Sequence, residues 1–310
     1  MLHKIFNAKN IEKSANYALF AGVFFTLVSF ITSSYLFRNV PSLIGVSTVI
    51  FTVTMTLPIL LTFFDDIALY DKKKSFAVKT KKLLDFYIYF FIGSFVTFFL
   101  VSLVMPSKVL SSEQIYGTTK IIVPKTAGLP PPPIDANQLL FGIFKNNFSV
   151  MIAAFVLSLI FGAGSLFLLT LNASIFASTL SSILWQTMQN TDYVYLYSLI
   201  SCNMGILFFH MLPEVIAYFL SAIAGALLYV SITKESLFSE EFKKTMKKSL
   251  LVLLIAIGVL LISALIEVKL SRNLIASGVC LKNTSYVLIA TVLIFIGLII
   301  FEMKRKKTGS

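Results

Sequence analysis

The chain has 310 residues, of which 57% are hydrophobic and 13% are charged, and its mean hydropathy is +0.88. A soluble domain needs more polar surface than this to cover its core, so the composition indicates a multi-pass protein of the cell membrane in contact with lipid. The net charge of +12 does not indicate a nucleic-acid partner, because the Lys and Arg residues stand in short blocks beside apolar runs.

Apolar runs of about twenty residues, enough to cross about 30 Å of hydrocarbon, recur along the chain. A weaker run at 173–188 is short for a crossing and rich in Ser and Ala. The start of the chain is polar and shows no cleavage site, so we expect no removable signal peptide. The strong runs are 17–37, 42–64, 86–105, 148–171, 204–232, 250–266 and 286–301.

The distribution of basic residues decides whether the run at 173–188 crosses the membrane. If the N-terminus is cytoplasmic and this run crosses, most of the 26 Lys and Arg residues lie inside, including the block from Lys234 to Lys248. A re-entrant hairpin would place that block outside, against the positive-inside tendency. We therefore predict an all-α protein with about eight spans and both termini inside.

These spans divide the chain into three regions. Residues 1–105 form an N-terminal three-helix membrane region, 106–146 an extracytoplasmic loop, and 147–310 a five-helix core. Within the loop, the prolines from Pro130 to Pro133 favour an extended spacer. The apolar residues from Leu139 to Phe144 that follow are compatible with a short helix in the outer interface or with an extension of the next span.

Two inner segments, 71–85 and 235–249, are rich in lysine. In the second segment, Phe238, Phe242 and Met246 recur every four residues, as on one face of a helix. Either these segments lie against anionic lipid headgroups, or they dock a cytoplasmic partner such as an ATPase. The sequence does not choose between the two interpretations.

The run at 204–232 differs from the others because it contains His210 and Glu214. An ionisable residue in a span is costly and faces protein or water, which makes this pair a candidate functional site. Residues four apart share a helix face, and Pro213 between them should kink the helix and free a carbonyl near His210. The topology brings polar residues of two other spans to the same outer level. We define the polar cluster as His210, Glu214, Glu267, Asn146 and Asn147.

Small residues predict where helices approach one another closely. Gly162 and Gly164 lie in the middle of the predicted span 148–171, and Ser221 and Gly225 lie four residues apart in the span 204–232. Such spacing lets backbones pack without large side chains between them. It is a packing signal that carries no chemistry of its own.

The two cysteines, Cys202 and Cys280, fall in predicted outer loops. A disulfide between them could persist on that side of the membrane. Two free thiols are the alternative, because the sequence does not show that the two loops meet.

Three stretches of the chain resemble the stage II sporulation protein M family of integral membrane proteins. They are FKNNFSVMIAAFVLSLIFGAGSLFLLTLNASIFA, HMLPEVIAYFLSAIAGALLY, which includes Pro213, and LISALIEV. That family typically shows an Asn-rich helix start, a later Asn-Gly, a His-Gly-x-x-Glu stretch and an Ala-x-x-Glu; here Ala173 and Met211 replace the two glycines. The resemblance covers roughly 137–268 and leaves spans one to three without a counterpart. The matching positions are Asn146, Asn147, Asn172, His210, Glu214, Gly225 and Glu267.

The resemblance implies a role in a membrane complex. The founding bacterial member of the family works with cell-wall hydrolases, whereas many relatives have no assigned activity. Partners expected on this basis are outer-surface enzymes. A cytoplasmic ATPase, suggested by the lysine-rich segments, and a second copy of the chain are further candidates. Asn172, between the predicted spans four and five, falls at the inner face, away from the polar cluster.

Three functions fit these residues. We expect a non-enzymatic scaffold or partner-docking subunit in which the polar cluster orders the helices. The alternative is a permease for lipid or a small solute that uses the same cluster as a polar or proton-relay crevice. A zinc hydrolase using His210, Glu214 and Glu267 is less consistent, because the second His of a zincin helix is missing. We therefore expect no enzymatic activity, no metal and no cofactor.

Overall fold

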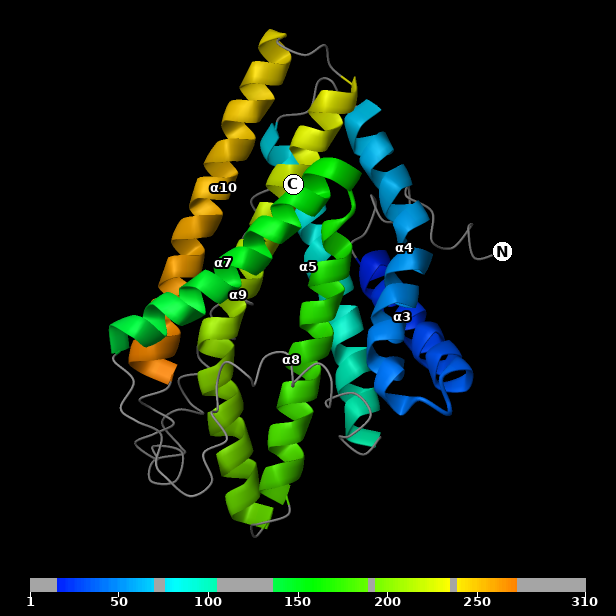
Figure 1. The fold of residues 1–310 in the computed structure, drawn as a ribbon, viewed down its shortest axis with the longest axis vertical. Helices are drawn as coiled ribbons and strands as arrows, with labels where there is room; N and C mark the ends of the chain where they lie inside the picture. Colours follow the sequence, from blue (N-terminus) through cyan, green and yellow to red (C-terminus); the bar gives the residue numbers. More distant parts are fainter. Residues whose placement is uncertain (1–15, 70–75, 105–135, 189–192, 235–238, 272–310) are drawn as a thin grey trace, which may run out of the picture.

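The computed structural model describes residues 16–69, 76–104, 136–188, 193–234 and 239–271 (Figure 1). These ranges are helical and contain no strand. The long helices are α3 (Asn16–Leu36), α4 (Ile44–Leu69), α5 (Phe76–Val104), α7 (Ala136–Phe161), α8 (Ser165–Met188), α9 (Tyr193–Lys234) and α10 (Glu240–Ile266). A short 3₁₀ helix, η1 (Pro41–Leu43), precedes α4, and a π-helical turn, η2 (Glu267–Ser271), continues α10.

Seven helices of the described part are long and apolar enough to cross a membrane. The protein is therefore an all-α, multi-pass membrane protein, as its composition predicts. The run at 173–188 lies within α8, a single helix of 24 residues that belongs to this set. The predicted span 286–301 and both chain ends lie outside the described residues, so the count of eight and the orientation stay predictions.

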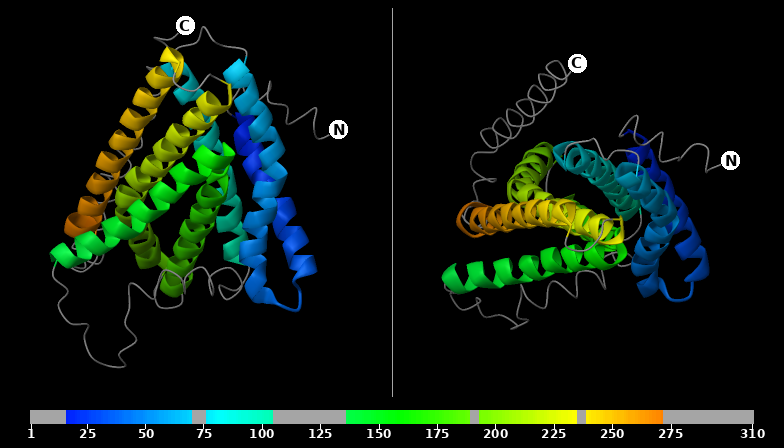
Figure 2. Two further views of the ribbon diagram at one scale, coloured as in Figure 1. Left: turned by 45° about the horizontal axis from the view of Figure 1, so that its top comes forward. Right: turned by 90° about the horizontal axis from the view of Figure 1, so that it is seen from above.

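The helices form one bundle around a shared core. Consecutive helices run in opposite directions, and α8 lies between the group of α3, α4 and α5 and the group of α7, α9 and α10 (Figures 1 and 2). The apolar core is continuous across both groups, because buried side chains from every long helix meet in it. Its members include Ala18, Leu60, Tyr87, Met151, Leu166, Tyr218 and Leu260.

The predicted span 148–171 is wrong at its inner end. Helix α7 stops at Phe161 and α8 starts at Ser165, so Gly162 and Gly164 lie in a tight turn rather than in mid-span. Gly162 has a φ of 67°, in the left-handed region that other residues rarely adopt. A Cβ on Gly162 would also meet the Tyr229 ring of α9 at 2.8 Å. Hydropathy missed this turn because every residue around it is small or apolar.

The structure also places Asn172 inside a helix and shows where α7 begins. Asn172 lies inside α8 and not between two spans, and its Nδ2 donates to the carbonyl of Leu168 at 2.8 Å. Helix α7 runs without a break from Ala136, so the apolar residues 139–144 extend this span and do not form a separate interfacial helix. Helix α10 likewise joins the lysine-rich segment to its span.

Helix α9 is much longer than the predicted span 204–232. Its 42 residues have a length of about 63 Å, roughly twice the hydrocarbon thickness. Its apolar span covers only Phe208–Thr233, and the preceding part extends with the end of α8 beyond the other helices (Figure 1). Cys202 consequently lies in a helix and not in a loop. Cys280 lies outside the described residues, so the disulfide stays untested.

Helices α3 and α5 approach so closely that they leave no room for side chains at two glycines. A Cβ on Gly22 would lie 2.4 Å from the carbonyl oxygen of Phe90, and one on Gly93 would lie 2.2 Å from that of Leu19. Backbone atoms cannot yield as a flexible side chain can. The two glycines therefore set the distance between α3 and α5.

We predict that Gly93→Ala lowers the melting temperature of the detergent-solubilised protein, because overpacking of this kind costs about 1–3 kcal/mol. The matched control is Gly258→Ala on α10, where an added Cβ meets nothing within 4 Å. That substitution should be neutral or stabilising, since alanine favours a helix over glycine by about 1 kcal/mol. Equal effects of the two substitutions would contradict the close approach of α3 and α5.

Candidate functional site

His210 on α9 is held by the π-helical turn η2. Its Nδ1 lies 3.1 Å from Oγ of Ser271, and that hydroxyl donates to the carbonyl of Ile206 at 3.2 Å. A serine hydroxyl carries one hydrogen, so the hydrogen between His210 and Ser271 comes from the imidazole. While Ser271 donates to Ile206, the imidazole therefore carries its proton on Nδ1.

A third hydrogen bond joins the same two segments. Ser263 of α10 donates from Oγ to the carbonyl of His210 at 2.6 Å, one turn before Pro213. Pro213 has no N–H, and the helical bonds around it are therefore fewer than in a regular turn. We name Ile206, His210, Ser263 and Ser271 the serine clasp, because two serines of α10 and η2 bind one turn of α9.

Glu214 lies one turn beyond His210 on the same helix. Its side chain is 7% exposed, and its Oε1 accepts a hydrogen bond of 2.7 Å from the hydroxyl of Tyr218. Glu267 of η2 is close enough to interact electrostatically with both Glu214 and Tyr218. Ser263, Glu267 and Ser271 recur every four residues, which places them on the side of α10 and η2 that faces α9.

The Asn pair lies on α7, next to this arrangement. Asn146 is exposed and donates from Nδ2 to Oδ1 of Asn147 at 3.1 Å, and Asn147 is half-buried. Helix α7 contacts α9, α10 and η2. The structure thus brings His210, Glu214 and Glu267 together and leaves the Asn pair on a neighbouring helix with a hydrogen bond of its own.

Two small residues of α9 fix its distance from α7. Ser221 donates from Oγ to the carbonyl of Met151 at 2.6 Å, and a Cβ on Gly225 would lie 2.3 Å from the carbonyl oxygen of Phe155. The contact is therefore between backbones, with one hydrogen bond across it. It holds α9 between α7 on one side and α10 on the other.

Sequence reasoning missed three members of the site: Tyr218, Ser263 and Ser271. Tyr218 follows Glu214 by four residues, which is the same spacing that singled out His210 and Glu214. The two serines had no such signal, because serine is common in these spans. In the described ranges, no group of three or more His, Cys, Asp or Glu side chains is arranged to hold a metal ion.

We predict that Ser271→Ala lowers the melting temperature of the protein, because the buried hydrogen bond from Ser271 to the Ile206 carbonyl is lost and such a bond contributes about 1 kcal/mol. Adding His210→Ala should cost less in the double variant than the two single losses combined, since both changes remove the same contact. Ser149→Ala is the control, because this exposed hydroxyl bonds only to the Lys145 carbonyl of its own helix. If the stability losses of the two single variants add fully in the double variant, as measured by thermal unfolding, the contact between His210 and Ser271 is contradicted.

The segment that contains these residues matches a known protein family. The family model of Stage II sporulation protein M matches residues 86–272, more than half of the chain. None of the curated proteins and none of the solved structures matches it. The match begins in α5, so the expectation that the third span has no counterpart in this family is wrong. All members of the polar cluster and of the serine clasp lie inside the matched segment.

Proposed function

Because the chain belongs to the stage II sporulation protein M family of membrane proteins, we propose that it is a non-enzymatic scaffold that docks partner proteins in a complex of the cell membrane. The observation that carries this proposal is that the polar groups of the site form hydrogen bonds with one another and with neighbouring backbone carbonyls. The hydrogen bonds of the serine clasp join α9 to α10 and η2, and Tyr218 satisfies Glu214 within α9. Such a network suits a fixed arrangement of helices.

The proposed docking element is the helical hairpin formed by the end of α8 and the start of α9. It extends beyond the other helices at the same end of the bundle as η2 (Figure 1). In the predicted orientation this end is extracytoplasmic. Trp185 of α8 is 38% exposed near the hairpin, and large aromatic side chains are common anchors at protein interfaces.

The serine clasp lies where the hairpin enters the bundle. Ile206 and His210 lie on either side of Phe208, where the apolar span of α9 begins, and Ser271 bonds to both from η2. A projecting helix that is bound at its base keeps a defined direction. We infer that the clasp presents the hairpin to partners on the outer side in one orientation.

This proposal predicts different effects of two substitutions of Glu214. Glu214→Gln keeps the side-chain volume and an acceptor for Tyr218, so co-purifying partners should stay within about twofold of the wild-type amount. Glu214→Ala leaves the buried Tyr218 hydroxyl without its partner, which costs about 1–3 kcal/mol, and should reduce both the melting temperature and the partners recovered.

The measurement is affinity purification from native membranes in mild detergent, with quantitative mass spectrometry of the recovered proteins. Equal and severe loss with both substitutions would instead require the charge of Glu214. That result, with an unchanged melting temperature, would sink the scaffold role.

A photo-crosslinking amino acid at position 185 tests the docking element directly. We expect it to capture a protein partner in native membranes, because Trp185 is exposed near the hairpin. The control position is Leu254, which is 64% exposed on α10 and is predicted to face lipid. Crosslinks of equal yield at both positions, or none at 185, would contradict docking at the hairpin.

A further inference from the structure

The starts of α5 and α10, each of which carries lysines, meet at one end of the bundle. The ammonium group of Lys248, on α10, lies over the ring of Phe76, at the start of α5, at 5.3 Å from its centroid. This cation–π contact joins two helix starts that are far apart in the sequence. The contact therefore places the lysines near both helix starts at the same end of the bundle.

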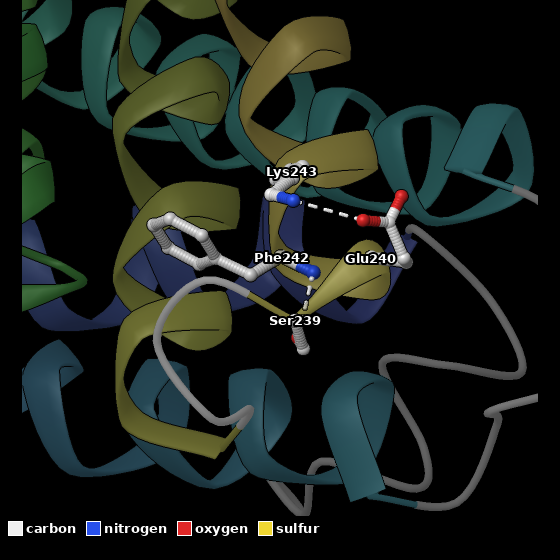
Figure 3. Close-up of polar contacts among 4 residues, drawn as sticks. All are labelled: Ser239, Glu240, Phe242 and Lys243. Carbon is white, nitrogen blue, oxygen red and sulfur yellow. Dashed lines mark hydrogen bonds and ion pairs between the residues drawn. The ribbon is translucent and has the colours of Figure 1, made fainter.

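The first turn of α10 is well defined. Ser239 caps the helix by accepting a hydrogen bond of 3.1 Å from the backbone N–H of Phe242, and Lys243 pairs with Glu240 at 2.9 Å (Figure 3). Glu240 and Glu241 occupy the first turn, where acidic residues stabilise a helix start. The lysines that follow are thus presented on a formed helix.

Two lysines of α10 lie on the side of the helix that is turned away from the bundle. Ser249 and Ala256 are fully buried and mark the side that packs on the bundle, and Lys244 and Lys247 are exposed on the opposite side. The same side continues along the span with Leu251, Leu254 and Ile255, which are 58%, 64% and 50% exposed. One helix face is therefore cationic at its start and apolar along the membrane.

Helix α5 repeats this pattern. Lys81 is exposed near its start, and Ile92, Val96 and Leu100 are exposed on the same side further along. Within the part of the chain that the structure describes, Lys81, Lys244 and Lys247 have no ion-pair partner, whereas Lys243 is paired. The surface therefore carries uncompensated positive charge at the level of lipid headgroups.

We propose that the inner lysine surface, formed by Lys81, Lys244, Lys247 and Lys248, binds the phosphodiester headgroups of anionic lipids in the inner leaflet. The apolar residues below each lysine favour a lipid over a soluble acidic protein. A lipid whose acyl chains lie along Leu251 and Leu254 has its phosphate at the level of Lys247. Phe76 and Lys248 hold the two halves of the surface together, so one headgroup layer contacts both helices.

The test uses the full chain, reconstituted in mixed bilayers of phosphatidylcholine and phosphatidylglycerol and then extracted in mild detergent. Lipid mass spectrometry should find phosphatidylglycerol enriched over the bulk mixture on the wild-type protein. Lys244→Gln with Lys247→Gln should lower this enrichment by about fivefold or more, because each lysine near an anionic surface contributes roughly that factor. Lys244→Arg with Lys247→Arg should keep the enrichment.

The matched control is Arg38→Gln with Lys145→Gln, which removes the same charge from exposed positions away from this surface. It should leave the enrichment unchanged. No enrichment on the wild-type protein, or the same loss in the control, overturns the proposal. Capture of a cytoplasmic protein that needs Lys244 and Lys247, without enrichment of phosphatidylglycerol, overturns it in favour of a protein partner.

Discussion

The arrangement of α9 depends on hydrogen bonds that cross between helices where water is absent. In hydrocarbon a polar group must find its partner within the protein. Ser263 and Ser271 meet this requirement by binding a carbonyl each on α9, and Ser271 also accepts from His210. The turn next to Pro213, where regular helical bonding is interrupted, is thereby joined to the neighbouring helix. The interrupted turn of α9 is thus the part that α10 and η2 bind.

Close backbone contacts also position the helices relative to one another. Gly225 and Ser221 bring α7 against α9, and Gly22 and Gly93 bring α3 against α5. Lipid tails are as apolar as the side chains of a neighbouring helix, so the hydrophobic effect does not drive helices together, and packing and hydrogen bonds decide which helices associate. The clasp fixes one side of α9 and the small residues fix the other. His210 and Glu214 lie on the helix that is held between them.

Much of this could be read from the sequence, and the misses have physical causes. Composition and hydropathy are enough for the helical membrane class. A lone His and a lone Glu in an apolar run are the reason why the candidate site is placed on α9. The turn at Gly162 was not predicted, because apolar runs on both sides of a tight turn have the hydropathy of one continuous span. Ser271 escaped because its role depends on η2 meeting α9, a tertiary contact that no local pattern reports. The predicted topology put Glu267 at the depth of Glu214, and the two side chains interact electrostatically in the structure.

The tight turn between α7 and α8 also limits how these helices can move. Its three residues, 162–164, span about 10 Å even when extended, so the adjoining helix ends cannot separate. Away from this turn the two helices diverge (Figure 1). The separation between the two helices is therefore smallest at the turn and grows along each of them. Asn146 in α7 and the projecting hairpin at the end of α8 both lie away from the turn.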